Sequence, residues 1–145
     1  MEVFARLTDL ASMHPRLLWN DVAASAAAVF KECGFDSRCR LQVETSEVPG
    51  FLDRTLELEI DRSGISQVRQ ARVRRTYDSA RLVELAAIAV AGLALYHAGK
   101  HTLRDIARRG TGADYLVDDE KHLLEVAGRS RRRDLESVRA ARLKR

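Results

Sequence analysis

A long apolar stretch in the second half of the chain constrains the fold more than any other feature of the sequence. From Leu82 to Tyr96 almost every residue is apolar, and the spacing predicts a helix that begins at Ser79, whose hydroxyl can cap it, and stops at Gly99. A helix that is apolar on nearly all sides has to be buried on most of them. Its most apolar run, Leu85 to Tyr96, has 12 residues, whereas a bilayer-spanning helix needs about 20. We therefore expect a buried core helix and no membrane partner.

Length and composition favour one folded domain over residues 1–145. The chain is 46% hydrophobic and 32% charged, which is enough apolar material for a core and too much for a disordered chain. The first residues lack the basic and apolar regions of a secretory signal. Two cysteines, Cys33 and Cys39, are too few for a disulfide framework. We expect free thiols in a cytoplasmic protein.

Residues 1–78 have the patterns of a helix followed by a β-meander. Apolar side chains at helical spacing and an alanine-rich run predict a helix over 15–33. Apolar and charged residues alternate over 41–45 and 56–61 and, less regularly, over 68–74. This alternation predicts three antiparallel strands with one buried face and one charged face. The arginines of the third segment fit a solvated sheet face better than a nucleic-acid surface.

The last third of the chain predicts a hairpin and a basic helix. Residues 101–109 fit either a short helix or a strand, and the glycines after them break either one. Residues 113–117 then indicate a strand, 118–120 a turn and 122–127 the returning strand. Ser130 can cap the final helix. The predicted fold class is α+β, with the antiparallel meander and the hairpin packed against the long buried helix.

Three possible metal ligands precede this hairpin. His97, His101 and Asp105 have the spacing that would place them on one face of a single helix. Gly99 interrupts that helix. We therefore expect these three residues to be ordinary surface residues.

Two acids, Asp114 and Glu125, fall at the open end of the predicted hairpin. Antiparallel pairing around the turn brings these two positions close together, and the neighbouring glycines allow close approach of a ligand. Paired carboxylates suit a hard divalent cation such as Mg²⁺ or Mn²⁺. Three alternatives stay open at this point: a bound metal, a non-catalytic relic of such a site, and ordinary carboxylates that pair with nearby arginines.

This pattern resembles the PD-(D/E)xK, or restriction-endonuclease-like, nuclease superfamily over residues 79–145. In that family an Asp on one core strand is followed on the next strand by Asp or Glu, any residue and Lys, and an acid on the preceding helix often completes the metal site. The resemblance implies a restriction-endonuclease-like core in which Asp114 and Glu125 are catalytic and hold Mg²⁺ or Mn²⁺. Glu84 would be the helix acid. Ala127 stands where the family has its lysine.

The positive surplus of the chain is confined to its last 25 residues. The net charge is +4, and it divides into −2 over residues 1–120 and +6 over residues 121–145. Phosphate-backbone binding, docking on an acidic protein partner or a second copy of this chain, and a solvated helix all remain open as explanations. The candidate nucleic-acid contacts in this segment are Arg129, Arg131, Arg132, Arg133, Arg139 and Arg142.

Two functions from different classes follow from these features. The first is a nucleic-acid-binding, nuclease-like protein that hydrolyses phosphodiesters with a bound metal, with one of the arginines between 129 and 133 at the scissile phosphate. The second is a non-catalytic interaction or assembly protein on the same fold, which Ala127 favours. In that case the edge of the meander and the basic helix would bind a protein partner or form a homo-oligomer.

Overall fold

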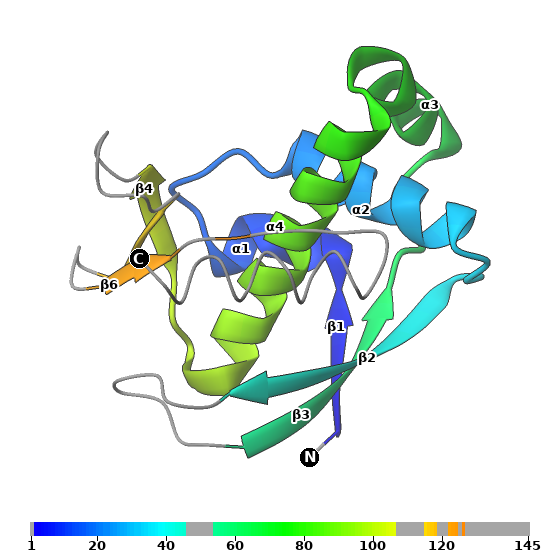
Figure 1. Ribbon diagram of the computed structural model, residues 1–145. Coiled ribbons are helices and arrows are strands. Elements are labelled where there is room, and N and C mark those ends of the chain that lie inside the picture. Colours follow the sequence, from blue (N-terminus) through cyan, green and yellow to red (C-terminus); the bar gives the residue numbers. More distant parts are fainter. Residues whose placement is uncertain (1, 46–53, 107–114, 119–121, 125, 127–145) are drawn as a thin grey trace.

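The long apolar stretch forms helix α4 (Ser79–Gly99), and the other described elements are arranged around it (Figure 1). The computed structural model describes residues 2–45, 54–106, 115–118, 122–124 and 126. Within these residues the fold is mixed α+β, which confirms the predicted class. The elements other than α4 are β1 (Glu2–Arg6), η1 (Leu7–Asp9), α1 (Leu10–Met13), α2 (Asn20–Glu32), β2 (Arg38–Thr45), β3 (Arg54–Asp61), α3 (Gln67–Thr76), β4 (Leu103–Ile106), β5 (Tyr115–Val117) and β6 (His122–Leu124).

Both ends of α4 have defined caps. At the N-terminus the carboxylate of Asp78 accepts a hydrogen bond from the backbone N–H of Arg81, so Asp78 is the cap and Ser79 is the first helical residue. At the C-terminus Lys100 adopts a left-handed conformation with φ 55°, and its N–H donates to the carbonyl of Tyr96. The predicted bounds are therefore confirmed, and the predicted cap is wrong by one residue.

Helix α4 is the core helix of the described structure. Leu85, Ala89 and Leu93 are buried along it, and it packs closely against α2, whose buried face consists largely of alanines. Small side chains let the two helix backbones approach. By length and composition alone α4 is also long and apolar enough to cross a membrane. The run from Leu85 to Tyr96, with its 12 residues, did not predict this. Within the described residues 39% of its apolar window is buried, in the cluster that α4 shares with α2, β4 and β5, so the expected burial on most sides is met only in part.

A three-stranded sheet in the order β1-β3-β2 closes one side of this core. Strands β2 and β3 form the predicted antiparallel hairpin, with Leu41 opposite Leu58, whereas β1 pairs with β3 in parallel. The row Ala5, Ile60 and Cys39 faces the core. The outer face carries the charges, for example in the row Arg6, Asp61 and Arg38.

The predicted third strand of the meander, residues 68–74, is wrong, because this segment lies in helix α3. Ser66 caps that helix by accepting a hydrogen bond from the N–H of Arg69. Gln70 and Val73, three residues apart, share its buried face. The segment between 66 and 76 contains four arginines and two glutamines, which favour helix. The third strand of the sheet is β1 instead, and it was not predicted.

The helix predicted over 15–33 begins only at Asn20, as α2. Residues 15–19 are held instead by Trp19, whose indole N–H donates to the carbonyl of His14 at 2.8 Å. The ambiguous segment 101–109 contains strand β4, at least over its described part. Together with β5 and β6 it forms a second, antiparallel sheet in the order β4-β5-β6. The predicted hairpin is thus present in the described residues.

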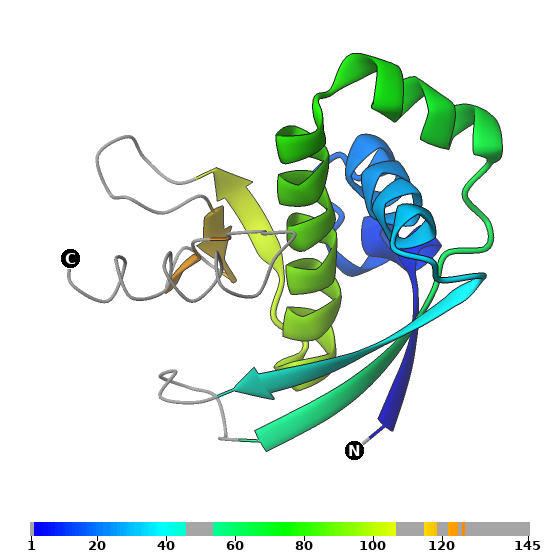
Figure 2. The ribbon, with the colours of Figure 1, turned by 45° about the vertical axis from the view of Figure 1, so that its right-hand side comes forward.

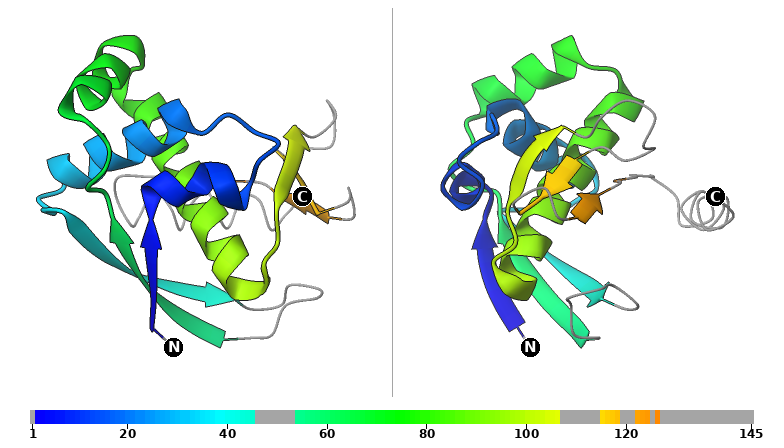
Figure 3. Two further views of the ribbon diagram at one scale, coloured as in Figure 1. Left: turned by 180° about the vertical axis from the view of Figure 1, so that it is seen from behind. Right: turned by 90° about the vertical axis from the view of Figure 1, so that its left-hand side faces the viewer.

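The two sheets meet helices α1, α2 and α4 in one buried cluster. It joins Ala5 of β1 and Ile60 of β3 to Leu103 of β4 and Val117 of β5. Val73 of α3 packs in a second cluster with Ala24, Ala28 and Leu82. Figure 2 shows α4 between α2 on one side and β4 with its partner strands on the other, while the first sheet crosses near the C-terminal half of α4. Figure 3 shows α3 at the N-terminal end of α4, away from both sheets.

Candidate metal and nucleic-acid site

Hairpin β5–β6 is the element at whose open end the carboxylate hypothesis places its two acids. Tyr115 lies opposite Leu124, and Val117 lies opposite His122. Asp114 and Glu125 lie outside the described residues, and each directly adjoins one member of the Tyr115–Leu124 pair. Antiparallel pairing proceeds one residue at a time along both strands. The described register ends at the Tyr115–Leu124 pair, so the pairing of these two acids stays a prediction.

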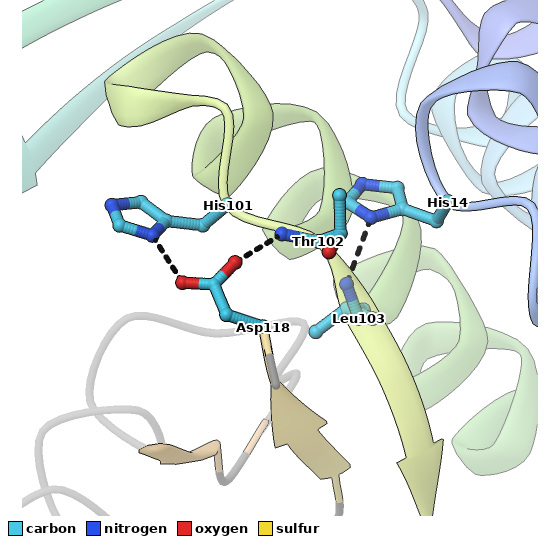
Figure 4. A network of polar contacts seen from close by, with 5 residues as sticks. All are labelled: His14, His101, Thr102, Leu103 and Asp118. Atoms are coloured by element: carbon cyan, nitrogen blue, oxygen red, sulfur yellow. Dashed lines mark hydrogen bonds and ion pairs between the residues drawn. The ribbon is translucent and has the colours of Figure 1, made fainter. Parts of the chain in front are cut away.

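The turn end of this hairpin is fixed to the start of β4 by Asp118 (Figure 4). Its backbone N–H donates to the carbonyl of Thr102 at 2.7 Å, and its Oδ1 accepts from the N–H of Thr102 at 3.0 Å. Its Oδ2 lies 2.8 Å from Nδ1 of His101. Asp118 has φ 56°, a left-handed conformation that Asp tolerates better than most residues. These contacts hold the hairpin in place at the end away from the predicted metal site.

Strand β4 is fixed in turn by a buried histidine. His14 is 0% exposed, and its Nδ1 accepts a hydrogen bond from the N–H of Leu103 at 3.0 Å (Figure 4). Because a backbone N–H can only donate, Nδ1 is unprotonated and Nε2 carries the proton. Nε2 therefore donates to the carbonyl of Gly92, 2.8 Å away. The neutral imidazole thus joins the α1–α2 connection, α4 and β4.

Burial sets the protonation state of His14. The loss of water lowers the pKa of His14 below its ordinary value, and the hydrogen bond to the Gly92 carbonyl opposes part of this shift. The ring also lies against Trp19, with ring centroids 5.1 Å apart. Gly92 makes this packing possible, because a Cβ at that position would lie 3.1 Å from Cδ2 of Leu10 and 3.2 Å from Cη2 of Trp19.

Glu84, the proposed helix acid, lies in the N-terminal half of α4. Its side chain is 49% exposed and forms an ion pair with Arg81, 2.8 Å away. Figure 2 shows β4 running back along α4 from the C-terminal end of the helix. Since β5 is antiparallel to β4, the end of β5 at Tyr115 is directed toward the N-terminal half of α4. Glu84 and the open end of the hairpin therefore lie toward the same end of that helix.

The other predicted site residues lie outside the described part of the chain. This applies to the second-strand position Ala127 and to both carboxylates of the proposed metal pair. It also applies to all the candidate nucleic-acid contacts, namely Arg129, Arg131, Arg132, Arg133, Arg139 and Arg142. Within the described residues, no three His, Cys, Asp or Glu side chains come together as a possible metal group.

The three possible ligands before the hairpin do not share one helix. His97 belongs to α4, His101 follows its end and Asp105 lies on β4. Burial lowers the pKa of His97, while the charge of Asp9 raises it. Nε2 of His97 is buried and has no hydrogen-bond partner among the described residues. The expectation of three ordinary surface residues is wrong for His101, whose side chain is only 18% exposed and pairs with Asp118. It is also wrong for His97, whose Nε2 is buried, whereas Asp105 is exposed.

Sequence reasoning missed the two residues that position the hairpin, His14 and Asp118. The partners of His14 are 78 and 89 residues away along the chain, and a single histidine after a short helix has no local signature. Asp118 had one available signal, since Asp is common at turn positions that need positive φ. Neither residue belongs to a motif.

Compared with known proteins, the chain matches no family model, no curated protein and no solved structure.

Proposed function

We propose that this chain binds nucleic acid and acts as a metal-dependent, nuclease-like protein at the open end of the β5–β6 hairpin. The observation that carries the proposal is the order α4, β4, β5 and β6, with Tyr115 opposite Leu124. This order supports the resemblance to the restriction-endonuclease-like superfamily, in which a helix acid precedes two neighbouring strands that each supply a carboxylate.

The donor set fits a hard cation. Asp114 and Glu125 offer carboxylate oxygens, the ligands that Mg²⁺ and Mn²⁺ prefer. Such an ion, when bound, makes water more acidic and stabilises negative charge on a phosphate. Glu84 is the third acid of the proposed site. Its ion pair with Arg81 is exposed and therefore worth at most about 1 kcal/mol, so Glu84 can exchange this partner at small cost.

The basic end of the chain supplies the affinity for nucleic acid in this proposal. The surplus of +6 over residues 121–145 directly surrounds and follows Glu125. Arginines bind phosphate oxygens with paired hydrogen bonds and give affinity that depends on salt but not on base sequence. One of Arg129 to Arg133 would hold the scissile phosphate. A guanidinium stabilises phosphate charge there but is a poor proton acceptor.

A second candidate function is supported by one residue. Ala127 replaces the lysine that the nuclease family uses at the scissile phosphate. A chain with this replacement fits a non-catalytic protein that uses the same fold to bind a protein partner or a second copy of itself. In that case the basic segment and an edge of the first sheet would form the contact.

Cleavage of supercoiled plasmid and of single-stranded DNA in Mg²⁺ or Mn²⁺ distinguishes the two functions. The variants are Asp114→Asn and Glu125→Gln, with Glu44→Gln on β2 as a matched carboxylate control. The proposal predicts cleavage and a metal-induced thermal shift in wild type and in Glu44→Gln, and loss of both in the two site variants. Absence of both effects in wild type would refute the metal site. Absence of both cleavage and DNA binding would favour the non-catalytic, protein-binding function.

A further inference from the structure

Helix α3 carries a row of arginines that the fold does not use. It has four arginines and no acid in ten residues. Its buried face contains Gln70 and Val73. Arg74 is also part of the fold, because its Nε lies 3.0 Å from Oε1 of Glu32 and its Nη2 donates to the carbonyl of Ala28 on α2 at 3.0 Å. One of the four arginines is therefore structural.

The other three, Arg69, Arg72 and Arg75, form an exposed row. They are all exposed, and within the part of the chain that the structure describes no ion pair joins them to an acid. They are three residues apart, so successive side chains are neighbours on the helix, about 4.5 Å apart along its axis. We call these three residues the α3 arginine row.

This row costs stability without contributing to packing. Like charges three or four residues apart on a helix destabilise it by about 0.2–0.5 kcal/mol per pair. The Ser66 cap and the burial of Val73 keep α3 folded in spite of this. A local cost with no structural gain is typical of a functional surface. Because the row is cationic throughout, its partner is an anion with several charges in line.

We infer that the α3 arginine row binds the phosphate backbone of a nucleic acid. This inference rests on the proposed function for the class of ligand, but it concerns a separate surface. Phosphates along one strand repeat at an axial spacing of about 3.4 Å, so three arginines within about 9 Å of helix can each reach one. Guanidinium groups match phosphate oxygens with two parallel hydrogen bonds.

Other anionic partners fit this surface less well. A helix that binds membranes presents a broad apolar face next to its basic face, whereas Val73 of α3 is buried and Val68 is the one large apolar residue exposed on the helix. Binding sites for proteins are usually centred on aromatic anchors, and α3 contains no aromatic residue. A phosphate backbone needs only the charges.

The position of α3 relative to the hairpin suits a ligand that contacts both. In Figure 2 the N-terminal half of α4 lies between α3 and the sheet of β4, β5 and β6. The α3 arginine row would thus extend the binding site well beyond the proposed metal centre.

The test is fluorescence anisotropy with a labelled 20-base-pair DNA duplex over a range of salt concentrations. The row variant is R69Q/R72Q/R75Q, in which glutamine keeps a good helix former at each position. The matched control is R6Q/R38Q/R40Q, which removes three arginines from the outer face of the first sheet, where they lie opposite acids. A third variant, R131Q/R132Q/R133Q, changes the basic end of the chain. Circular dichroism checks that each variant keeps its helix content.

The inference predicts that the row variant binds roughly tenfold or more weakly at low salt and that its salt slope is smaller by about 2 to 3, while the control binds as wild type does. If the row variant binds like wild type and the basic-end variant does not, the inference is wrong and the proposed function stands. If wild type fails to bind DNA at all, both are wrong. Equal losses in the row variant and the control would also overturn the inference, because they would indicate only net charge. If the row variant lost binding to vesicles of anionic lipid but kept its DNA binding, the row would be assigned to a membrane surface and the inference would be wrong.

Discussion

Replacement of His14 by Phe removes the two hydrogen bonds through which this histidine joins β4 to α4. Phe keeps an aromatic ring against Trp19 but offers neither an acceptor for the N–H of Leu103 nor a donor for the carbonyl of Gly92. Both backbone groups remain buried, since Leu103 and Gly92 are buried residues of the folded chain. The variant therefore isolates the energetic role of the imidazole nitrogens.

The expected loss follows from these two groups. A buried donor left without a partner costs about 1–3 kcal/mol, which applies fully to Leu103. The carbonyl of Gly92 can still accept its hydrogen bond within the helix, so losing the bond from His14 costs only about 1 kcal/mol. The free energy of unfolding should fall by about 2–4 kcal/mol, or roughly 6–16 °C in Tm for a domain of this size.

The pH dependence supplies a second, independent readout. Burial lowers the pKa of His14 in the folded chain, so the unfolded chain binds the proton first as pH falls. The stability contributed by neutral His14 is complete above about pH 6.5, the ordinary pKa of histidine. It is lost as pH falls from there to the folded pKa. The Phe variant should lack this part of the dependence.

The measurement is urea unfolding, followed by circular dichroism, at a series of pH values between 5 and 8. The control is His97→Phe, because Nε2 of His97 has no hydrogen-bond partner among the described residues. Its pKa is also lowered by burial, so the control should lose part of the pH dependence but little of the stability at neutral pH. An unchanged free energy of unfolding in His14→Phe at pH 7.5 would refute the role assigned to this histidine.

Three further predictions follow from the same packing. Asp78→Ala should cost about 1 kcal/mol through loss of the α4 cap, while Ser79→Ala should be nearly neutral, and equal effects in thermal melts would contradict the cap assignment. Gly92→Ala should destabilise the fold by about 1–2 kcal/mol, because the new Cβ would lie 3.1 Å from Cδ2 of Leu10. This crowding costs more than the gain in helix propensity. A rise in Tm would show instead that Leu10 and Trp19 can move aside. Cys33 is exposed and Cys39 is buried, and burial raises the pKa of the Cys39 thiol. A thiol reagent should therefore modify Cys33 quickly and Cys39 only on unfolding. Equally fast modification of both thiols would contradict the burial of Cys39.

Local patterns were sufficient for some elements. The apolar stretch predicts α4, and strict alternation predicts β2 and β3, because each pattern extends over several turns or strand residues. The same reasoning failed at 68–74, where valines and an alanine between arginines suggest a strand but Ser66 and the spacing of Gln70 and Val73 form a helix. Short segments with mixed signals are decided by what they pack against.

The site shows the same division. Residues 113–127 have turn and strand signals strong enough to predict the hairpin, and the described strands β5 and β6 pair as a hairpin with Tyr115 opposite Leu124. What positions that hairpin was not predictable, because Asp118 acts through Thr102 and His101 in another segment. The tautomer of His14 likewise depends on a backbone N–H contributed by β4.

The sequence by itself determined where the chain has to bury apolar surface and where it collects positive charge. Those features depend on residue type and short-range period, which act before any long-range contact forms. Only the tertiary structure decided that β1 joins the sheet in parallel with β3, that the arginines around Arg72 line a helix, and that a buried neutral His14 fixes β4. These outcomes depend on backbone groups brought together from distant parts of the chain, because a buried N–H or carbonyl needs a partner that no local pattern specifies.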